Sequence, residues 1–287
     1  MNTNLHLKTE PTKDYELLDS GDGFKLERFG SVTVSRPDPQ VLWEKQKGVL
    51  WQNTDAQFVT GWQGKKNVAE NWTVTIEDLT FSLKLSSFKH VGIFPEQVSN
   101  WQWIKQKVKN ADRPISVLNL FGYTGGATMA ALSSGASVVH VDGSKVSLSL
   151  ARHNAELSKL ADKPVRWILD DALEFAKREV RRGNTYDAII MDPPAFGHGP
   201  KGEEWKIERD LPTLIEVCSK LLSVDPLFFI LNGYAAGYSP VAYAQLLEQV
   251  KEKMKGITQY GELSLAESGS ERLLPAGIYA RVEKREV

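Results

Sequence analysis

One stretch restricts the fold of this chain more than any other: an apolar run that breaks at a glycine turn and continues as an alanine-rich segment. The run is residues 117–120, the turn is residues 121–126, and the alanine-rich segment is residues 127–134. This order predicts a buried strand, a tight turn and a helix. Glycine lets a ligand approach the backbone, and the start of the helix offers unpaired N–H groups. The stretch therefore predicts a turn that binds a nucleotide-like cofactor.

From Ile115 onward, short apolar runs alternate with helical patterns. This alternation predicts parallel strands joined by right-handed crossovers, in a doubly wound α/β sheet with helices on both faces. Two strands near the end of the chain are expected to pair antiparallel at the sheet edge, with a link containing Pro275 and Gly277 between them. The expected strands are 115–120, 137–141, 165–169, 188–191, 227–231, 257–265 and 278–282.

The first third of the chain has a different pattern. Residues 1–13 are polar and aperiodic, which predicts a flexible tail. Residues 14–87 contain short runs of β-forming residues separated by turn residues, which predicts a small β-rich domain, and residues 88–287 are assigned to the α/β domain. A helix is expected over residues 95–110, because proline suits a first helical turn and Glu96 there complements the helix dipole.

Composition narrows the class of protein. The chain has 287 residues and a net charge of −1, so its overall charge gives no argument for nucleic acid binding. Its only cysteine, Cys218, excludes an intrachain disulfide and a cysteine-rich zinc site, and no metal is expected. The first residues lack a signal-peptide pattern and no apolar stretch is long enough to span a bilayer, so a cytoplasmic protein without a membrane partner is expected. The sequence leaves the oligomeric state open.

Distinctive residues follow four successive predicted strands, at the sheet edge where open α/β folds bind ligands. The glycine turn follows the first. Asp142 follows the second, twenty positions past Gly122, where a carboxylate can accept both hydroxyls of an adenosine ribose. Residues 170–172 follow the third, with an acidic group suited to the exocyclic amine of adenine, and residues 192–197 follow the fourth. Together these features predict a cofactor that contains adenosine.

The run from Val117 to Phe196 resembles the class I S-adenosylmethionine-dependent methyltransferases. More narrowly, it resembles the bacterial large-subunit ribosomal RNA methyltransferases of the RlmI/RlmK type. The resemblance covers about residues 88–235, and the N-terminal RNA-binding PUA module of that family has no counterpart before Tyr15. The motifs that carry it are Phe121–Gly126, Val141–Lys145, Asp192–Gly197 and Phe94–Gln97, the last resembling a segment that enters the family's cofactor pocket.

The resemblance implies a Rossmann-like methyltransferase sheet, S-adenosylmethionine as the cofactor and RNA, ribosomal RNA in particular, as the substrate and partner. It places Asp192, Pro193 and Pro194 beside the transferred methyl group, with Phe196 as a further catalytic residue. The residues implied to bind the cofactor are Phe94, Gln97, Phe121, Gly122, Tyr123, Thr124, Gly125, Asp142, Gly143, Ser144, Asp171 and Ala172.

The residue types suit methyl transfer. The donor is a sulfonium cation whose charge is lost in an in-line displacement, so the enzyme mainly positions a nucleophile and excludes water. The two prolines after Asp192 fix the backbone and remove N–H donors, leaving carbonyls and the carboxylate as acceptors for a substrate N–H. Phe196 either stacks on a base, a contact of about 1–3 kcal/mol, or closes the hydrophobic edge of the sheet.

Three residues beyond this motif are candidates for substrate binding. His198 lies in a glycine-rich loop and is either a general base near neutral pH or an incidental residue of a mobile lid. Lys201 and Lys206 flank the predicted substrate opening, where they are candidates to contact phosphate. We therefore assign Phe196, His198, Lys201 and Lys206 to the substrate side.

Two departures from related motifs narrow the chemistry. Enzymes that methylate exocyclic amines carry an aromatic ring directly after the second proline, where this chain has Ala195. Pyrimidine C5 methylation needs a thiolate nucleophile, but Cys218 lies in an apolar helical pattern typical of a core residue, and residues 231–234 lack the cysteine that C5-type relatives place there. A ring nitrogen such as guanine N7 carries its own lone pair. The sequence thus favours a nucleobase nitrogen, without a cysteine nucleophile.

Three alternatives remain at this point. A small-molecule or protein substrate is favoured by the near-neutral charge and by the lack of an added RNA-binding module. An NAD-dependent oxidoreductase ranks lower, because the turn is not Gly-x-Gly-x-x-Gly and Asp-Pro-Pro has no evident role in hydride transfer. A non-catalytic RNA-binding module is disfavoured by the intact cofactor motifs.

Overall fold

The computed structural model describes residues 3–64, 68–87, 89–234 and 237–285. The chain forms two compact units. The sheet unit contains residues 1–7, 100–262 and 277–287, and the small unit contains residues 8–99 and 263–276. The boundary after residue 99 differs from the expected one after residue 87. Residues 89–99 belong to the small unit, where they form hydrogen bonds with its strands. The Arg36 guanidinium, for example, donates to the carbonyl of Lys89 at 3.1 Å.

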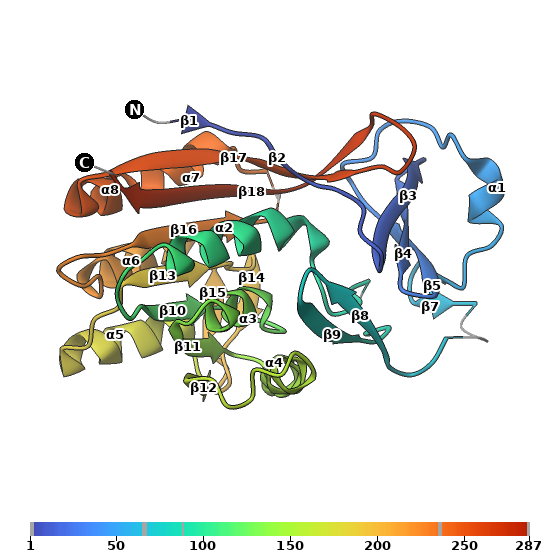
Figure 1. The fold of residues 1–287 in the computed structure, drawn as a ribbon. Helices are drawn as coiled ribbons and strands as arrows, with labels where there is room; N and C mark the ends of the chain where they lie inside the picture. Colours follow the sequence, from blue (N-terminus) through green and yellow to red (C-terminus); the bar gives the residue numbers. More distant parts are fainter. Residues whose placement is uncertain (1–2, 65–67, 88, 235–236, 286–287) are drawn as a thin grey trace. The chain divides into compact units, whose positions relative to one another are not determined.

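Within the described residues, the sheet unit is built on nine strands (Figure 1). Their order is β1-β17-β18-β16-β13-β10-β11-β12, with β2 also pairing with β17. The five strands from β16 to β12 are parallel, and β18 runs antiparallel to β16, as expected for the edge. The strands are β1 Thr3–Asn4, β2 Leu7–Thr9, β10 Ser116–Leu120, β11 Ser137–Asp142, β12 Val165–Leu169, β13 Ala188–Met191, β16 Phe228–Gly233, β17 Gly256–Ala266 and β18 Leu273–Lys284.

Two expectations at the sheet edge are wrong. Residues 1–13 are not simply a tail, because Thr3 pairs with Gln259 in a parallel ladder and the Leu5 N–H donates to the carbonyl of Tyr260 at 2.8 Å. An edge strand offers unpaired backbone groups, and this segment satisfies them. Pro275 lies inside β18 rather than in a link. The ladder with β16 begins only at Ile278, so the missing N–H of Pro275 removes no hydrogen bond from that ladder.

Helices cover both faces of the parallel strands (Figure 1). The side chains of β10 alternate: Leu118 enters a core formed with α5, α6 and α8, whereas Asn119 faces α3 on the other side. The helices are η2 Pro95–Gln97, α2 Val98–Lys109, α3 Gly126–Ser133, α4 Lys145–Leu157, α5 Ala172–Arg182, α6 Ile207–Lys220, α7 Pro240–Leu246 and α8 Glu248–Met254. None of the helices among the described residues is long and apolar enough to cross a membrane.

The small unit is β-rich, as expected. A five-stranded sheet of order β3-β4-β5-β6-β7 and a two-stranded hairpin β8-β9 form it in the described residues, with the short helices α1 and η2. Alternating apolar and polar residues and the turn at Asp22–Gly23 produce the first hairpin. The elements are β3 Tyr15–Gly21, β4 Phe24–Phe29, β5 Val32–Pro37, α1 Gly48–Trp51, β6 Ala56–Phe58, β7 Trp62–Gln63, β8 Trp72–Ile76 and β9 Leu79–Leu83.

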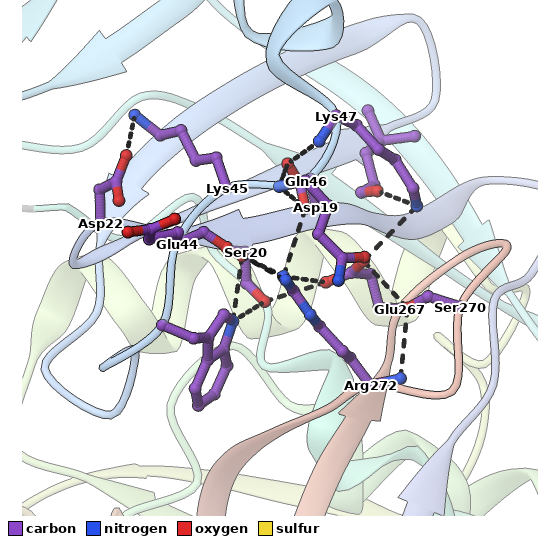
Figure 2. A network of polar contacts seen from close by, with 12 residues as sticks. Asp19, Ser20, Asp22, Glu44, Lys45, Gln46, Lys47, Glu267, Ser270 and Arg272 are labelled. Carbon is purple, nitrogen blue, oxygen red and sulfur yellow. Dashed lines mark hydrogen bonds and ion pairs between the residues drawn. The ribbon is translucent and has the colours of Figure 1, made fainter.

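A polar network binds the late segment 263–276 into the small unit (Figure 2). The buried carboxylate of Asp19 accepts from the backbone N–H of Lys47 at 2.9 Å, and its charge lies 3.7 Å from the Arg272 guanidinium. The buried carboxylate of Glu267 accepts from the Ser20 hydroxyl at 3.0 Å and lies 3.8 Å from the same guanidinium. Buried charges are tolerated when they are paired and hydrogen-bonded, and here that pairing joins residues more than two hundred positions apart.

Candidate active site

The turn after β10 has an unusual backbone. Phe121 and Tyr123 have φ values of 55° and 48°, and Gly125, which caps α3, has a φ of 92°. Left-handed backbone at a residue other than glycine costs about 1–3 kcal/mol and clusters at functional sites. The surrounding contacts hold this conformation: the Gly122 N–H donates to the carbonyl of Val141 at 3.1 Å, across to the neighbouring strand. The predicted cofactor turn is therefore a strained segment fixed at the end of the sheet.

Close packing explains two of its glycines. A Cβ on Gly122 would lie 2.4 Å from the imidazole of His140, and one on Gly126 would lie 2.2 Å from the indole of Trp101. Neither distance is possible for real atoms, so any side chain at these positions would displace a buried ring.

A chain of buried hydrogen bonds leads to His140, the ring that packs against Gly122 of the turn. The Asn119 amide donates to the Thr128 hydroxyl at 2.8 Å, and that hydroxyl shares a hydrogen bond with Nδ1 of His140 at 2.9 Å. Burial, with a smaller contribution from the Arg152 charge, lowers the pKa of His140 to about 3. The imidazole is therefore neutral at physiological pH. This chain was not predicted, because strand alternation places only Asn119 and His140 on one face of the sheet, whereas Thr128 comes from helix α3.

Asp142 joins the ends of β10 and β11. Its Oδ2 accepts from the backbone N–H of Tyr123 and its Oδ1 from that of Ser144, both at 2.8 Å. Burial raises the pKa of this carboxyl, and the two hydrogen bonds oppose that shift. Ser144 caps α4 by accepting from the N–H of Ser147 at 3.2 Å. Gly143 lies between Asp142 and Ser144 in the sequence. The structure thus brings the first two predicted motifs into direct contact.

The third motif is divided between two carboxylates. Asp170 is paired with the Arg178 guanidinium. Asp171 caps α5, where Oδ1 accepts from the N–H of Glu174 at 2.9 Å, and its Oδ2 forms no hydrogen bond within the described part of the chain. Ala172, the first residue of α5, is buried. Asp171 is consequently the carboxylate with an oxygen still available at the end of β12.

The fourth motif follows β13. The Asp192 side chain is half-buried, and no described residue forms a hydrogen bond with it. Burial raises the pKa of this carboxyl to about 6. Next to it, the Pro194 carbonyl accepts from the indole N–H of Trp205 at 2.7 Å, and the Trp205 ring lies 4.9 Å from that of Phe121. Trp205 was not among the predicted site residues. Its indole N–H occupies the Pro194 carbonyl, which leaves the Asp192 carboxylate as the principal hydrogen-bond acceptor of this motif.

The residues after this motif form a hairpin, β14 Phe196–His198 paired with β15 Glu204–Lys206. Phe196 is 53% exposed and its ring meets that of His198 edge to face at 5.0 Å, so Phe196 does not close the sheet edge. The hairpin tip packs on the second and third motifs: a Cβ on Gly143 would lie 3.3 Å from the His198 carbonyl, and one on Gly199 would lie 3.2 Å from the Cβ of Asp171.

The two lysines of this region differ. Lys206 forms a salt bridge with Glu204 at 3.2 Å, whereas Lys201 is exposed and its ammonium forms no salt bridge with a described residue.

Phe94 and Gln97 belong to the small unit, at the start and the end of η2. The Phe94 ring lies 5.3 Å from that of His90, and Gln97 is buried. Between them, burial raises the pKa of the Glu96 carboxyl to about 7. The part of Phe94 and Gln97 in cofactor binding stays a prediction.

Cys218 is fully buried on α6, as the helical pattern predicts, and burial raises the pKa of its thiol. In the described ranges, no group of three or more His, Cys, Asp or Glu side chains is placed to hold a metal ion.

Comparison with known proteins identifies the fold and the family. A family model described as S-adenosylmethionine-dependent methyltransferase matches residues 46–238. The crystal structure of the SAM-dependent methyltransferase from Agrobacterium tumefaciens is 37% identical, covers 99% of this chain and 96% of that one, and superposes with a TM-score of 0.95.

Among curated relatives, ribosomal RNA large subunit methyltransferase K/L of Hahella chejuensis is 35% identical over 183 residues, which are 63% of this chain but only 23% of the relative. Ribosomal RNA large subunit methyltransferase K of Neisseria meningitidis serogroup B is 28% identical over 235 residues, 74% of this chain and 64% of the relative. The chain thus spans about a quarter of the length of the K/L relatives that it matches. It belongs to the S-adenosylmethionine-dependent methyltransferase family and is an enzyme of that class.

Proposed function

We propose that this enzyme methylates a nucleobase nitrogen of RNA, ribosomal RNA in particular, by in-line transfer. Two neighbouring side chains carry the proposal. Asp192 has a half-buried carboxylate with no hydrogen-bond partner among the described residues, and Phe196, four residues later, exposes an aromatic ring. The names of the curated relatives, which are ribosomal RNA methyltransferases, support RNA as the substrate class.

The groups along this edge fit S-adenosylmethionine. When bound, the cofactor supplies a methyl group on a positively charged sulfur. Helix α3 begins directly after the turn at Phe121–Gly125. Its first backbone N–H groups suit the carboxylate at the amino-acid end of the cofactor. Each oxygen of Asp142 retains a lone pair for a ribose hydroxyl, with Gly143 and Ser144 beside it. The available oxygen of Asp171 and the N–H of Ala172 suit the adenine edge.

On the substrate side, the exposed ring of Phe196 can stack on a base, which contributes about 1–3 kcal/mol. Above a pH of about 6 the carboxylate of Asp192 is ionised and accepts a hydrogen bond from the base. Pro193 and Pro194 hold that carboxylate on a rigid backbone. Lys201, which has no salt bridge among the described residues, is the better candidate than Lys206 for a phosphate contact, and His198 supports the Phe196 ring.

The fully buried thiol of Cys218 supports a mechanism without a covalent intermediate. A cysteine nucleophile acts as a thiolate, and burial in an apolar core disfavours that form. The nucleophile is then the lone pair of the base itself.

Mass spectrometry of nucleosides from the ribosomal RNA of a deletion strain and its parent tests this proposal. We expect one methylated nucleoside to be lost in the deletion strain and restored by the wild-type gene and by Cys218→Ala, but not by Asp192→Asn. If the deletion strain retains every methylated nucleoside of its ribosomal RNA, the proposal of an RNA substrate is overturned. A small-molecule or protein substrate is then favoured, as the near-neutral net charge of −1 suggests. Failure of Cys218→Ala with normal protein levels would overturn the noncovalent mechanism.

A further inference from the structure

A chain of hydrogen-bonded polar side chains ends at Asn232, near the carboxyl end of β16. Asn232 is 4% exposed, and its Oδ1 accepts from the amide of Asn100 on α2 at 2.9 Å. Its Nδ2 forms no hydrogen bond with any residue that the structure describes. Burying an amide N–H without an acceptor is unfavourable, so this group calls for an explanation other than packing.

The chain passes through a buried guanidinium. Arg281, on β18, is 5% exposed and lies 4.2 Å from the centre of the Trp103 ring. It donates to Oε1 of Gln259 from Nε at 2.9 Å and from Nη2 at 2.7 Å, and from Nη1 to Oδ1 of Asn100 at 3.5 Å. Within the described ranges it forms no salt bridge. Burial lowers its pKa to about 10, so the group stays charged at physiological pH.

The charged groups of the chain fix the direction of every amide in it. A guanidinium can only donate, and the ionised carboxylate of Glu283, which accepts from Nε2 of Gln259 at 3.1 Å, can only accept. Gln259 and Asn100 therefore both turn their oxygens toward Arg281. The nitrogen of Asn100 then faces the oxygen of Asn232, which leaves the nitrogen of Asn232 as the outward end of the chain. Asn232 is thus oriented as a donor.

The register of the sheet places this donor next to the proposed acceptor. Leu231 pairs with Met191 of the parallel strand β13, and both side chains enter the apolar core. Asn232 and Asp192 are the next residues of the two strands, so they follow side by side at the same edge of the sheet. Because successive side chains alternate, Asn232 faces away from that core, toward α2.

We propose that Asn232 is a substrate-binding residue, whose Nδ2 donates a hydrogen bond to a carbonyl oxygen or ring nitrogen of the base beside the group that Asp192 accepts from. Asn100 and Arg281 are positioning residues that hold the amide in this orientation. The assignment rests on the proposed function. Unstacked bases are recognised by hydrogen bonds along their edges, where donors and acceptors lie side by side. A donor and an acceptor on neighbouring strands match such an edge.

Transfer of a radioactive methyl group from S-adenosylmethionine to ribosomal RNA of the deletion strain tests the assignment. Asn232→Asp keeps an oxygen toward Asn100 and removes the donor, and Asn232→Leu removes the donor without adding a charge. We expect both variants to lower kcat/KM for the RNA by roughly 10-fold or more, with the affinity for S-adenosylhomocysteine unchanged in calorimetry. Gln106→Glu makes the same amide-to-carboxylate change at an exposed position of α2 and should alter neither quantity.

The positioning role has a separate measurement. Arg281→Met removes the group that can only donate, so both asparagine amides can reverse, and kcat/KM for the RNA should fall by about 2-fold or more. Arg281→Lys keeps a group that can only donate and should restore most of that loss. Equal rates in the methionine and lysine variants would overturn the positioning role.

The outcomes separate this assignment from the proposed function. If the wild type transfers no methyl group to this RNA, the RNA substrate is rejected and the assignment with it. If the wild type labels the RNA and Asn232→Leu labels it equally well, the assignment alone is overturned, and a loss confined to Asn232→Asp is then an effect of the added charge. A loss of S-adenosylhomocysteine affinity in both variants would place Asn232 on the cofactor side and would also overturn it.

Discussion

At the scale of single residues, the proposed cofactor edge contains carboxylates whose hydrogen-bonding capacity is only partly used by the protein. Asp142 accepts one backbone N–H on each oxygen, so the same side chain fixes the turn at Tyr123 and retains lone pairs for a ligand. Asp170, by contrast, is paired with Arg178. The two aspartates have the same chemistry, and their hydrogen-bond partners decide which one is available.

Asp142→Ala should weaken binding of S-adenosylhomocysteine by about 10-fold to 100-fold, because hydrogen bonds to a charged group contribute about 1.5–3 kcal/mol. Isothermal titration calorimetry measures this, with Asp170→Asn as the control that should bind nearly as the wild type does. Equal affinity of Asp142→Ala and the wild type would place the carboxylate of β11 outside the cofactor site.

At the scale of elements, the β14–β15 hairpin combines two roles. Its tip packs against Gly143 and Asp171, on the side proposed to bind the cofactor, while Phe196 at its base stays 53% exposed. A short hairpin can expose such a ring because Trp205 on the facing strand supplies the anchor, buried and bonded to the Pro194 carbonyl. The element is thus fixed by one aromatic side chain and exposes another.

Phe196→Ala should weaken binding of ribosomal RNA by about 5-fold to 100-fold, from a stacking contribution of about 1–3 kcal/mol, without changing the affinity for S-adenosylhomocysteine. Filter binding and calorimetry measure the two affinities. Val224→Ala removes a more exposed apolar side chain from another loop and should change neither. A loss of cofactor affinity in Phe196→Ala would show that the ring acts on the cofactor side instead.

At the scale of the whole molecule, the small unit is discontinuous in sequence. Residues 263–276 return to it after the chain has passed through most of the sheet unit. The Arg272 guanidinium also donates to the carbonyl of Ser20 at 2.8 Å, and Lys47 forms an ion pair with Glu267 at 3.5 Å (Figure 2). The late segment is therefore held by ion pairs of buried carboxylates, and the loss of these pairs leaves the carboxylates without a counter-charge.

Arg272→Met should lower the free energy of unfolding by roughly 2–4 kcal/mol, somewhat less than for a fully buried pair, because this side chain is 23% exposed. Urea denaturation followed by circular dichroism measures the change. Lys8→Met removes a more exposed ion pair with Glu10 and should cost less than about 1 kcal/mol. Similar losses in the two variants would contradict a stabilising role for the network.

Local patterns predicted most strands and helices of the sheet unit and the places of the glycine turn and the strand-end aspartates. Apolar runs predicted strands such as 188–191, and the glycine turn and strand-end aspartates were found where the pattern placed them. The helical pattern also predicted correctly that Cys218 is a core residue. These features depend on periodicity and turn chemistry within a few residues, which any reader of the sequence can follow.

The sequence by itself determined the doubly wound sheet, the glycine turn between β10 and α3, and the burial of Cys218 in the core. Only the tertiary structure decided which groups pack together here: His140 against Gly122, Trp205 against Pro194, and Tyr243 against Gly233. It also decided that the first residues pair with β17, over two hundred positions away. Such contacts depend on strand order and register, which arise from packing of the whole chain and leave no short-range pattern in the sequence.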